Sequence, residues 1–176
     1  MEYLDIVNER NELLGFFKEK EKAHRDGNFH RTAHIWLINR NKELLLQLRS
    51  PNKSSFPNCW DISAAGHINH GESVIEGGLR ELKEELGVTA KPEDLQFVTI
   101  VRFGKETNSE FGFVYLMETD LKEEDFIFAD HEVAETKYIY YEDLEKMVLN
   151  KRENLLIHNN EEELLFEYIR NTIDKE

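Results

Sequence analysis

The stretch at residues 66–88 reads GHINHGESVIEGGLRELKEELGV and gathers acidic side chains around one arginine. A helix over residues 73–86 would place Glu81 and Glu85 one turn apart. Glu84 lies between them in the sequence and would share the same helix face. Like charges on one face repel each other, a cost that a bound cation would reverse. Because Mg²⁺ prefers oxygen ligands and is commonly held by one or two carboxylates together with substrate phosphates, the spacing predicts a helix face that holds divalent metal against a phosphate chain.

The residues around this acidic face suit the ends and the packing of the same helix. Arg80 can form a forked bond to a carboxylate and fix its orientation. Glu72 suits the positive end of the helix dipole, so we expect it to have a structural role and to bond to Arg80. Gly87 readily takes the left-handed conformation that ends a helix. Gly77 and Gly78 each cost about 1 kcal/mol relative to alanine in mid-helix, and they permit a close approach to a sheet.

An ordinary solvated acidic helix is the alternative explanation, because runs of charge are usually surface features. The stretch, however, satisfies every specified position of the pattern G-x5-E-x7-R-E-U-x-E-E-x-G-U, in which U is a bulky aliphatic residue, and chance agreement over so many positions is rare. The matching residues are Gly66, Glu72, Arg80, Glu81, Leu82, Glu84, Glu85, Gly87 and Val88. This pattern is the Nudix box, and on these residues the chain resembles the Nudix hydrolase superfamily.

The resemblance implies a fold and a set of site residues. The implied fold is α+β, an α/β/α sandwich with a central mixed β-sheet. Glu81, Glu84 and Glu85 are expected to hold Mg²⁺, with the Gly66 carbonyl as a further ligand and Mn²⁺ as the alternative ion. The expected catalytic residues are Glu84, Glu85, Glu110 and Arg80. Glu110 matches an acidic residue that many Nudix hydrolases carry at the rim of the active site.

The expected reaction is hydrolysis of a diphosphate linkage by attack of water on phosphorus. Phosphoryl transfer asks a protein for positioning and charge neutralisation more than for covalent chemistry. A bound metal lowers the pKa of a water molecule, and a carboxylate then accepts its proton. Glu84, Glu85 and Glu110 all remain candidates for that base. The expected substrate is a nucleoside diphosphate derivative or a similar phosphorylated metabolite.

Segments outside the box resemble one branch of the superfamily. Residues 3–9, 23–31 and 60–67 are similar to the Nudix hydrolases whose nearest relatives are the isopentenyl-diphosphate isomerases. Those isomerases carry a catalytic cysteine at the position that Ala65 occupies here, and alanine cannot donate a proton. Cys59 lies too far along the chain to replace it, and strand alternation does not bring it to the same place. Hydrolysis is therefore favoured, with an isomerase or a catalytically silent diphosphate-binding Nudix module as the alternatives.

Three histidines also follow the isomerase pattern. His24, His30 and His67 stand near the positions of the metal-ligating histidines of isomerases, and the match of His24 requires a shift of one residue. The carboxylate that completes that site corresponds here to Asn108, so the resemblance implies an incomplete second metal site. Ordinary hydrogen bonding in loops and at sheet edges is the alternative role of the three histidines.

Substrate contacts are expected on the loop that precedes the box. Arg49 and Lys53 fall where isomerases hold the diphosphate, and both suit phosphate binding. The group X attached to the diphosphate is expected to meet aromatic side chains, although aromatic residues in such segments are more often part of the core. The candidates are Phe29, Trp36, Trp60 and Phe103.

The elements that position these residues follow from apolar periodicity and from turn residues. A hairpin is expected around Arg40 and Asn41, a loop at residues 50–58, and a polar connection at residues 104–109. The predicted strands cover residues 3–7, 13–17, 30–39, 42–49, 60–65, 97–103, 111–118 and 136–140. The predicted helices cover residues 73–86, 142–149 and 161–173.

Length, composition and charge indicate the number of domains, the class of partner and the cellular location. The 176 residues, 40% of them hydrophobic, suit one domain that spans residues 1–176. The net charge of −14 argues against nucleic acid as a general partner, whereas metal can neutralise both an acidic pocket and a small polyphosphate. The single cysteine, the lack of a signal-peptide pattern and the short apolar runs favour a cytoplasmic protein without membrane insertion. We expect a small phosphorylated metabolite as its partner and a monomer or homodimer as its state.

Overall fold

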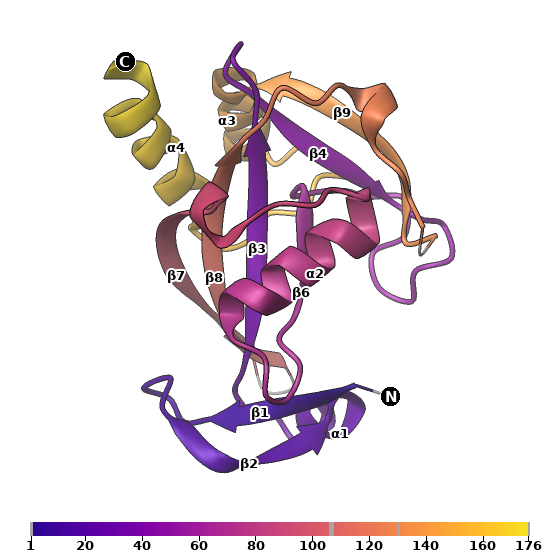
Figure 1. Ribbon diagram of the computed structural model, residues 1–176, viewed down its shortest axis with the longest axis vertical. Helices are drawn as coiled ribbons and strands as arrows, with labels where there is room; N and C mark the ends of the chain where they lie inside the picture. The colour runs from indigo at the N-terminus through magenta and orange to yellow at the C-terminus, as the bar shows by residue number, and fades with distance from the viewer. Residues whose placement is uncertain (1, 106–107, 130, 176) are drawn as a thin grey trace.

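The computed structural model describes residues 2–105, 108–129 and 131–175 and is built on a central seven-stranded sheet (Figure 1). Four strands follow the order β4-β3-β8-β7 across the sheet, β5 and β9 pair with β4, and β6 pairs with β3. Strands β3 and β8 are parallel and the other pairs are antiparallel, so the sheet is mixed, as expected. The bounds are β3 (His30–Ile38), β4 (Glu43–Arg49), β5 (Trp60–Asp61), β6 (Ala64–His67), β7 (Gln96–Lys105), β8 (Asn108–Glu118) and β9 (Val133–Tyr140).

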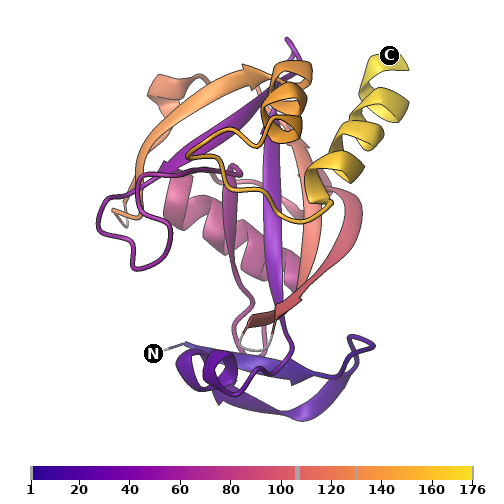
Figure 2. The ribbon, with the colours of Figure 1, turned by 180° about the vertical axis from the view of Figure 1, so that it is seen from behind.

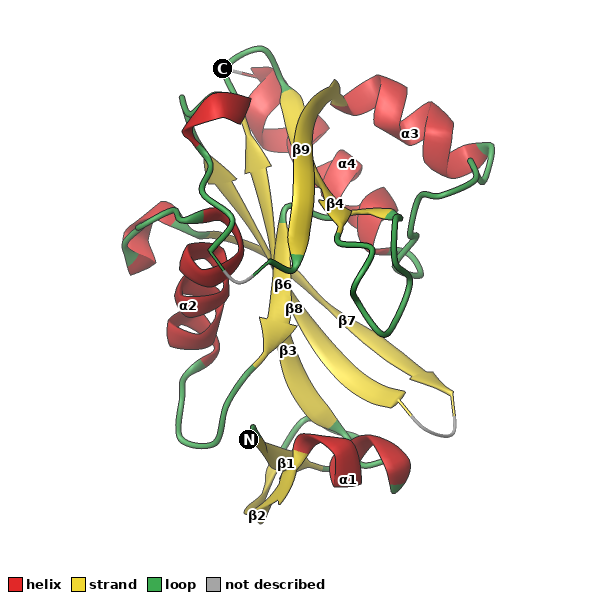
Figure 3. Cartoon of the chain, turned by 90° about the vertical axis from the view of Figure 1, so that its right-hand side faces the viewer, coloured by secondary structure: helices red, strands yellow, loops and turns green. Residues whose placement is uncertain are grey.

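Helices cover both faces of this sheet (Figure 3). Helix α2 (Val74–Leu86) packs on one face, where it meets Ile35 and Leu37 of β3. Helices α3 (Tyr141–Leu149) and α4 (Glu161–Thr172) pack on the other face, against Trp36 and Ile38 (Figure 2). Alternate residues of β3 thus serve two separate cores, because successive side chains of a strand point to opposite faces. The expected α/β/α sandwich is confirmed.

A small N-terminal unit lies at one end of the sheet (Figure 1). Strands β1 (Tyr3–Val7) and β2 (Leu13–Glu19) form an antiparallel pair, followed by α1 (Lys20–Arg25). Isolated bridges from Leu4 to Asn69 and from Val7 to Phe29 join this unit to the loop before α2 and to the start of β3. The short helical turns η1 (Pro92–Asp94), η2 (Glu123–Asp125) and η3 (Ile173–Lys175) complete the elements.

Helix α2 has the local signals that its sequence predicted. Ser73 caps its first turn and forms a capping box with Glu76. Gly87 ends it in the left-handed conformation, with φ of 71°. A Cβ on Gly78 would lie 3.2 Å from the side chains of Ala33 and Ile35, so this glycine permits the close approach of the helix to the sheet. The predicted box helix is confirmed.

Two of the expected β-segments differ in the structure. The single strand predicted at residues 60–65 is divided into β5 and β6. Between them Ser63 uses its hydroxyl as a substitute for backbone pairing, since Oγ donates to the Leu45 carbonyl at 2.6 Å and accepts from Leu37 N at 2.9 Å. The predicted hairpin forms, but β3 and β4 are in register only at Ile38 and Leu44, because β4 pairs over its length with β9.

The polar connection predicted at residues 104–109 is largely strand. Strand β7 continues to Lys105 and β8 begins at Asn108, with Gly104 opposite Ser109. Residues 106–107 lie outside the described part of the chain. Cross-strand pairing extends both strands here in spite of their polar composition, as tertiary context often does.

In the described residues, no helix combines the length and the apolar character needed to cross a membrane.

Candidate functional site

Arg80 is the centre of the box cluster. Its Nε and Nη2 bond to the two carboxylate oxygens of Glu72 at 2.9 and 3.1 Å. Its Nη1 donates to Glu81 at 2.7 Å and to Glu84 at 3.1 Å. Partial burial opposes the charge of Arg80, but hydrogen bonds to Glu72 and Glu81 raise the pKa of its guanidinium above the usual range. The guanidinium therefore orients three carboxylates at once.

The Glu81 carboxylate lies directly against the backbone of Gly66. A Cβ on Gly66 would overlap the carboxylate carbon of Glu81, so the glycine of the box is required for this contact. Burial raises the pKa of Glu81 to about 7, the bond from Arg80 opposes the shift, and the charge of Glu84 adds to it. The box thus brings a carboxylate against the backbone of Gly66, whose carbonyl is a predicted metal ligand.

Glu85 is the buried carboxylate of the box. Its Oε2 accepts from the Ala65 backbone N at 3.1 Å and from Gln47 Nε2 at 2.9 Å. Burial raises the pKa of Glu85 to about 8, and the nearby charge of Glu81 adds to the shift. Gln47 was not among the residues predicted from the sequence, although it is the one polar residue inside the apolar run 44–48. Gln47 holds Glu85 from the strand beside the helix.

These groups suit a divalent cation. Glu81 and Glu85 are close enough for the charge of one to raise the pKa of the other, a repulsion that a bound cation removes. The side chain of Glu84 is 51% exposed, so it can turn toward a ligand. Their hard oxygen donors are those that Mg²⁺ and Mn²⁺ prefer. Of the predicted ligands, Glu81 and Glu84 bond to Arg80. Glu81 also lies against Gly66, and Glu85 bonds to the neighbouring backbone N of Ala65, so all four meet at β6.

A second cluster lies on the other side of β6. The Nε2 atom of His24 is 3.2 Å from that of His30 and 3.1 Å from that of His67. Glu110 Oε1 lies 3.5 Å from His30 Nε2 and 3.7 Å from His67 Nε2. The ligand atoms of these four residues all lie within 4.8 Å of one another. The Asn108 side chain lies outside the described residues, and Glu110 supplies the carboxylate that the sequence analysis had assigned only to catalysis.

The elements that carry this histidine centre are distant in sequence. His24 lies in α1, His30 is the first residue of β3, and His67 is the last residue of β6. Glu110 lies beside His30 because β8 pairs in parallel with β3. Burial lowers the pKa of His24 to about 4, and its histidine neighbours add to the shift. Burial opposes the charge of Glu110, but bonds to His30 and His67 hold its pKa far below the usual range. Three imidazoles beside a carboxylate form a donor set for a transition metal.

The two expected phosphate clamps are engaged within the protein. Arg49 Nη1 bonds to Asp61 at 3.0 Å, and its Nη2 donates to the Ser55 carbonyl at 2.9 Å. Lys53 forms an ion pair with Glu132. Both side chains therefore hold the loop 50–58 and the segment before β9, and their binding of phosphate stays a prediction.

A buried polar network that was not predicted from the sequence lies between the sheet and α4. His34 Nδ1 bonds to Glu161 Oε2 at 2.7 Å, and Trp36 Nε1 donates to Glu161 Oε1 at 2.8 Å. His158 Nε2 bonds to Asp61 Oδ1 at 2.7 Å. One sequence signal was available, since His34 interrupts an otherwise apolar strand. Buried charges of this kind are usually paired, and these are.

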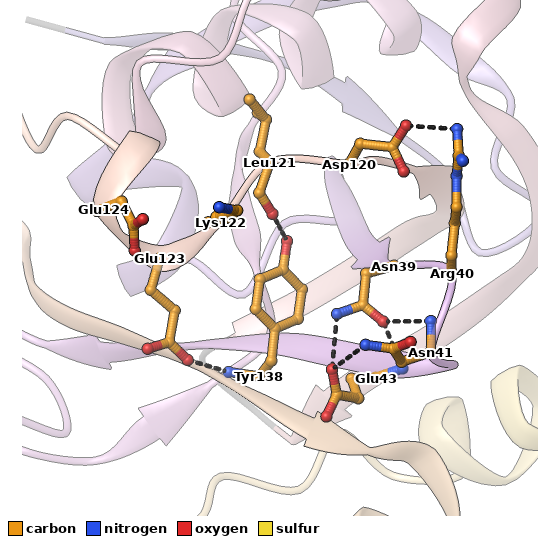
Figure 4. Close-up of a pocket in the computed structure, with 10 residues that line it drawn as sticks. All are labelled: Asn39, Arg40, Asn41, Glu43, Asp120, Leu121, Lys122, Glu123, Glu124 and Tyr138. Carbon is orange, nitrogen blue, oxygen red and sulfur yellow. Dashed lines mark hydrogen bonds and ion pairs between the residues drawn. The ribbon is translucent and has the colours of Figure 1, made fainter.

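The pocket drawn in Figure 4 lies at the β3–β4 turn and contains no residue of either cluster. Its polar groups bond to one another: Arg40 pairs with Asp120 at 2.7 Å, and the Tyr138 hydroxyl donates to the Leu121 carbonyl at 2.8 Å. These contacts suit a structural role in joining the turn to the segment after β8.

Comparison with known proteins agrees with the geometry. A profile of the NUDIX domain matches residues 28–158 of the chain. An uncharacterized Nudix hydrolase of Clostridium acetobutylicum is 38% identical over 157 residues, which cover 85% of this chain and 75% of that protein. Nudix hydrolase 3 of Arabidopsis thaliana is 37% identical over 151 residues, and the chain spans only 20% of the length of that longer protein.

Two further proteins are similar to the chain over most of its length. An isopentenyl-diphosphate Delta-isomerase of Aliivibrio fischeri is 31% identical over 154 residues, which cover 82% of this chain and 83% of that enzyme. A crystal structure from Deinococcus radiodurans has a TM-score of 0.67 and 31% identity, and the match covers 85% of this chain and 90% of that chain.

Proposed function

The chain belongs to the Nudix hydrolase family, whose members act on diphosphate linkages, and from this premise we propose that it is a metal-dependent diphosphohydrolase. The proposed reaction is attack of water on phosphorus in a diphosphate X-O-P-O-P, which breaks a phosphorus–oxygen bond and releases phosphate or a phosphorylated product. The observation that carries the proposal is the set of bonds from Arg80 to Glu72, Glu81 and Glu84. Such an array orients carboxylates for a cation rather than leaving them solvated.

Each box residue has a proposed role. A bound divalent ion supplies charge neutralisation at the phosphate oxygens and lowers the pKa of a water molecule. Glu81, Glu84, Glu85 and the Gly66 carbonyl are the proposed ligands, and Mg²⁺ is the proposed ion, with Mn²⁺ as the alternative. Arg80 keeps Glu81 and Glu84 in place, and Gln47 does the same for Glu85.

The proton acceptor is one of three carboxylates. Glu84 is half-exposed, Glu85 is buried, and Glu110 stays ionised because His30 and His67 bond to it. An ionised carboxylate is the form that accepts a proton. A pKa far below the operating pH also makes Glu110 a weak base, and burial raises the pKa of Glu85 to about 8, so all three carboxylates stay candidates.

The isomerase is the alternative with a specific basis, because one relative carries that name. Ala65 is the cross-strand partner of His34 and lies on the sheet face that carries Glu110. Its methyl group cannot donate or accept a proton, so an acid on that side of the substrate is missing from this position. Cys59 precedes β5 and is not part of β6. The missing thiol supports hydrolysis.

The proposed substrate is a small phosphorylated metabolite, with a nucleoside diphosphate derivative as the first choice. Arg49 and Lys53 are the proposed phosphate clamps. Lys53 would exchange its ion pair with Glu132 for a phosphate oxygen, and the cost is small because surface ion pairs contribute about 0–1 kcal/mol. A cytoplasmic location and the absence of general nucleic-acid binding complete the proposal.

A panel assay tests this function. Purified protein is incubated with nucleoside di- and triphosphates, ADP-ribose, other sugar nucleotides, coenzyme diphosphates and isopentenyl diphosphate, with Mg²⁺ or Mn²⁺. All products are separated by chromatography, because ADP-ribose and sugar nucleotides yield two phosphorylated products and no inorganic phosphate. We expect hydrolysis of at least one diphosphate and none after chelation of the metal. Conversion of isopentenyl to dimethylallyl diphosphate would support the isomerase instead. Tight ligand binding without hydrolysis under either metal would support a silent binding module.

A further inference from the structure

The sheet face that carries Glu110 continues toward α4 as a strip of aromatic and polar side chains. Phe103 is the cross-strand partner of Glu110 in the β7–β8 pair, so both lie on this face. Gly112 is the next residue of β8 on the same face, and a Cβ there would approach the Phe103 ring to 2.6 Å. The glycine lets Phe103 lean over β8 and stack on His34, with ring centres 5.4 Å apart.

His158 lies in the segment before α4 and packs at the end of this strip, next to His34 and Phe103. Its ring stands edge-on to His34, with centres 5.5 Å apart, and edge-on to Phe103, with centres 6.1 Å apart. Its Nε2 is held by Asp61, which Arg49 holds in turn. The backbone N of His158 donates to the Glu162 carboxylate at 2.8 Å. The position of the ring is therefore fixed from two sides.

The other ring nitrogen of His158, Nδ1, has no hydrogen bond within the described part of the chain. Among the described side chains, only Glu162 Oε2 is buried without a hydrogen-bond partner, so Nδ1 reaches solvent. The His158 side chain is 22% exposed, in agreement with this. Burial opposes its charge, but Asp61 raises the pKa of His158 to about 9. At neutral pH the ring thus carries a second N–H that is fixed in direction and open to a ligand.

A metal site does not explain this group. The ligand atoms of His34, His158 and Glu161 lie within 4.8 Å of one another. Both oxygens of Glu161, however, already accept hydrogen bonds, one from His34 and one from Trp36. The bond to Asp61 anchors the ring without using Nδ1, so this nitrogen is available to a ligand.

We propose that His158 is a specificity-determining residue of this enzyme, whose Nδ1–H donates to an acceptor atom of the group X while Phe103 forms the apolar wall beside it. The inference rests on the proposed function and names the part of X that is recognised. Phe103 is the cross-strand partner of Glu110 and its ring contacts His158, so His158 extends the face of Glu110 toward α4, where we place X. A hydrocarbon X would leave the charged N–H without an acceptor, a cost that disfavours such substrates. Asp61 is the positioning residue in this arrangement.

Two substitutions at one position separate the two nitrogens. In His158→Gln the amide nitrogen can reach the place of Nε2 and keep the bond to Asp61, whereas the Nδ1 donor is lost. In His158→Asn the shorter amide keeps a donor near Nδ1 and loses the bond to Asp61. The probes are ADP-ribose, which has a polar X, and methyl diphosphate, in which X is reduced to a methyl group. The matched control is His131→Gln. His131 is an exposed histidine that belongs to neither cluster.

We expect His158→Gln to raise KM for ADP-ribose about tenfold or more, the effect of losing a charged hydrogen bond, and to leave kcat/KM for methyl diphosphate unchanged. His158→Asn should recover part of the loss, and His131→Gln should change neither substrate. An equal loss for both substrates, or no loss for ADP-ribose, would overturn the inference. If either His158 variant fails to fold, Phe103→Leu gives the same comparison through the apolar wall.

The proposed function and this inference can fail separately. Absence of turnover by the wild type contradicts the function, and the inference is then tested by calorimetric binding of the same two ligands. Weaker binding of ADP-ribose alone in His158→Gln supports it. Equal affinities of wild type and variant, or no binding of ADP-ribose to the wild type, overturn it.

Discussion

Arg80 donates from Nη2 to the backbone carbonyl of His67 at 2.8 Å. The His67 side chain points to the opposite side of β6, where its Nε2 lies 3.1 Å from His24 and 3.7 Å from Glu110. One residue of β6 therefore contacts both the box carboxylates, through Arg80, and the histidine centre. The two clusters are held in a fixed relation across a single strand, and a change in one is expected to reach the other.

Arg80→Lys should lower kcat/KM by about 100-fold, because an ammonium group cannot reproduce the forked bonds that orient three carboxylates. Glu72 would also lose its two-point contact, so a smaller loss of thermal stability is expected. The measurement is steady-state turnover of the best substrate in the panel, beside a thermal melt. Lys83→Ala, on the exposed side of the same helix, is the control and should be silent. Wild-type turnover by Arg80→Lys would contradict the orienting role.

Gly66→Ala and Gly78→Ala should separate activity from stability. The Cβ of the first would overlap the Glu81 carboxylate and push a proposed ligand out of place, so activity should fall at least about 100-fold. The Cβ of the second would lie 3.2 Å from Ala33 and Ile35, so it should change the free energy of unfolding, by about 1–3 kcal/mol, more than turnover. The pair is compared by kinetics and by urea unfolding. If Gly66→Ala lowered the free energy of unfolding and left turnover unchanged, Gly66 would act only in packing.

The histidine centre should bind a transition metal in addition to the ion of the box. Titration calorimetry with Zn²⁺ or Mn²⁺ should detect a site in the wild type, and His30→Gln should weaken it by about 100-fold or more, because a ligand is removed. His131→Gln serves again as the control. If wild type and His30→Gln gave identical titrations, the prediction of a metal site would be wrong, and the four side chains would form only a hydrogen-bonded cluster.

The pH dependence of stability should carry a contribution from His158. Its folded pKa is about 9, above the ordinary 6.5, so its contribution is fully present below pH 6.5 and is lost as pH rises through 9. The groups that face it are Asp61 from β5, His34 from β3, and Glu161 and Glu162 from α4. The stability advantage of wild type over His158→Gln in urea should therefore shrink between pH 6 and pH 10, by up to about 3 kcal/mol. A constant difference would show that the charge of His158 does not stabilise the fold.

The sequence predicted the elements whose signals are local. Helix α2 carries its own cap at Ser73, its own stop at Gly87 and its acidic face, so its bounds and its chemistry were readable without the rest of the chain. Strand interiors were equally visible from their apolar residues. The break at Ser63 was not, because it depends on bonds to Leu37 and Leu45, which are distant in sequence.

Contacts between distant segments account for what the sequence did not show. Glu110 joins the histidine centre only because β8 pairs in parallel with β3 and places it beside His30. His158 meets Asp61 only because the segment before α4 folds back onto β5, where Leu155 bridges Trp60. A residue type and its local neighbours do not encode such pairings, so polar residues of this kind look unremarkable until the topology is known.

The central claim, that the box carboxylates support hydrolysis of a diphosphate, is tested most directly by Glu85→Gln. The amide keeps the shape of the side chain but cannot ionise to hold a metal, so the fold should persist, whereas hydrolysis of the best substrate should fall by about 1,000-fold or more. Glu93→Gln, on an exposed glutamate after the helix, is the matched control and should keep full activity. Wild-type turnover by a folded Glu85→Gln variant would contradict the account.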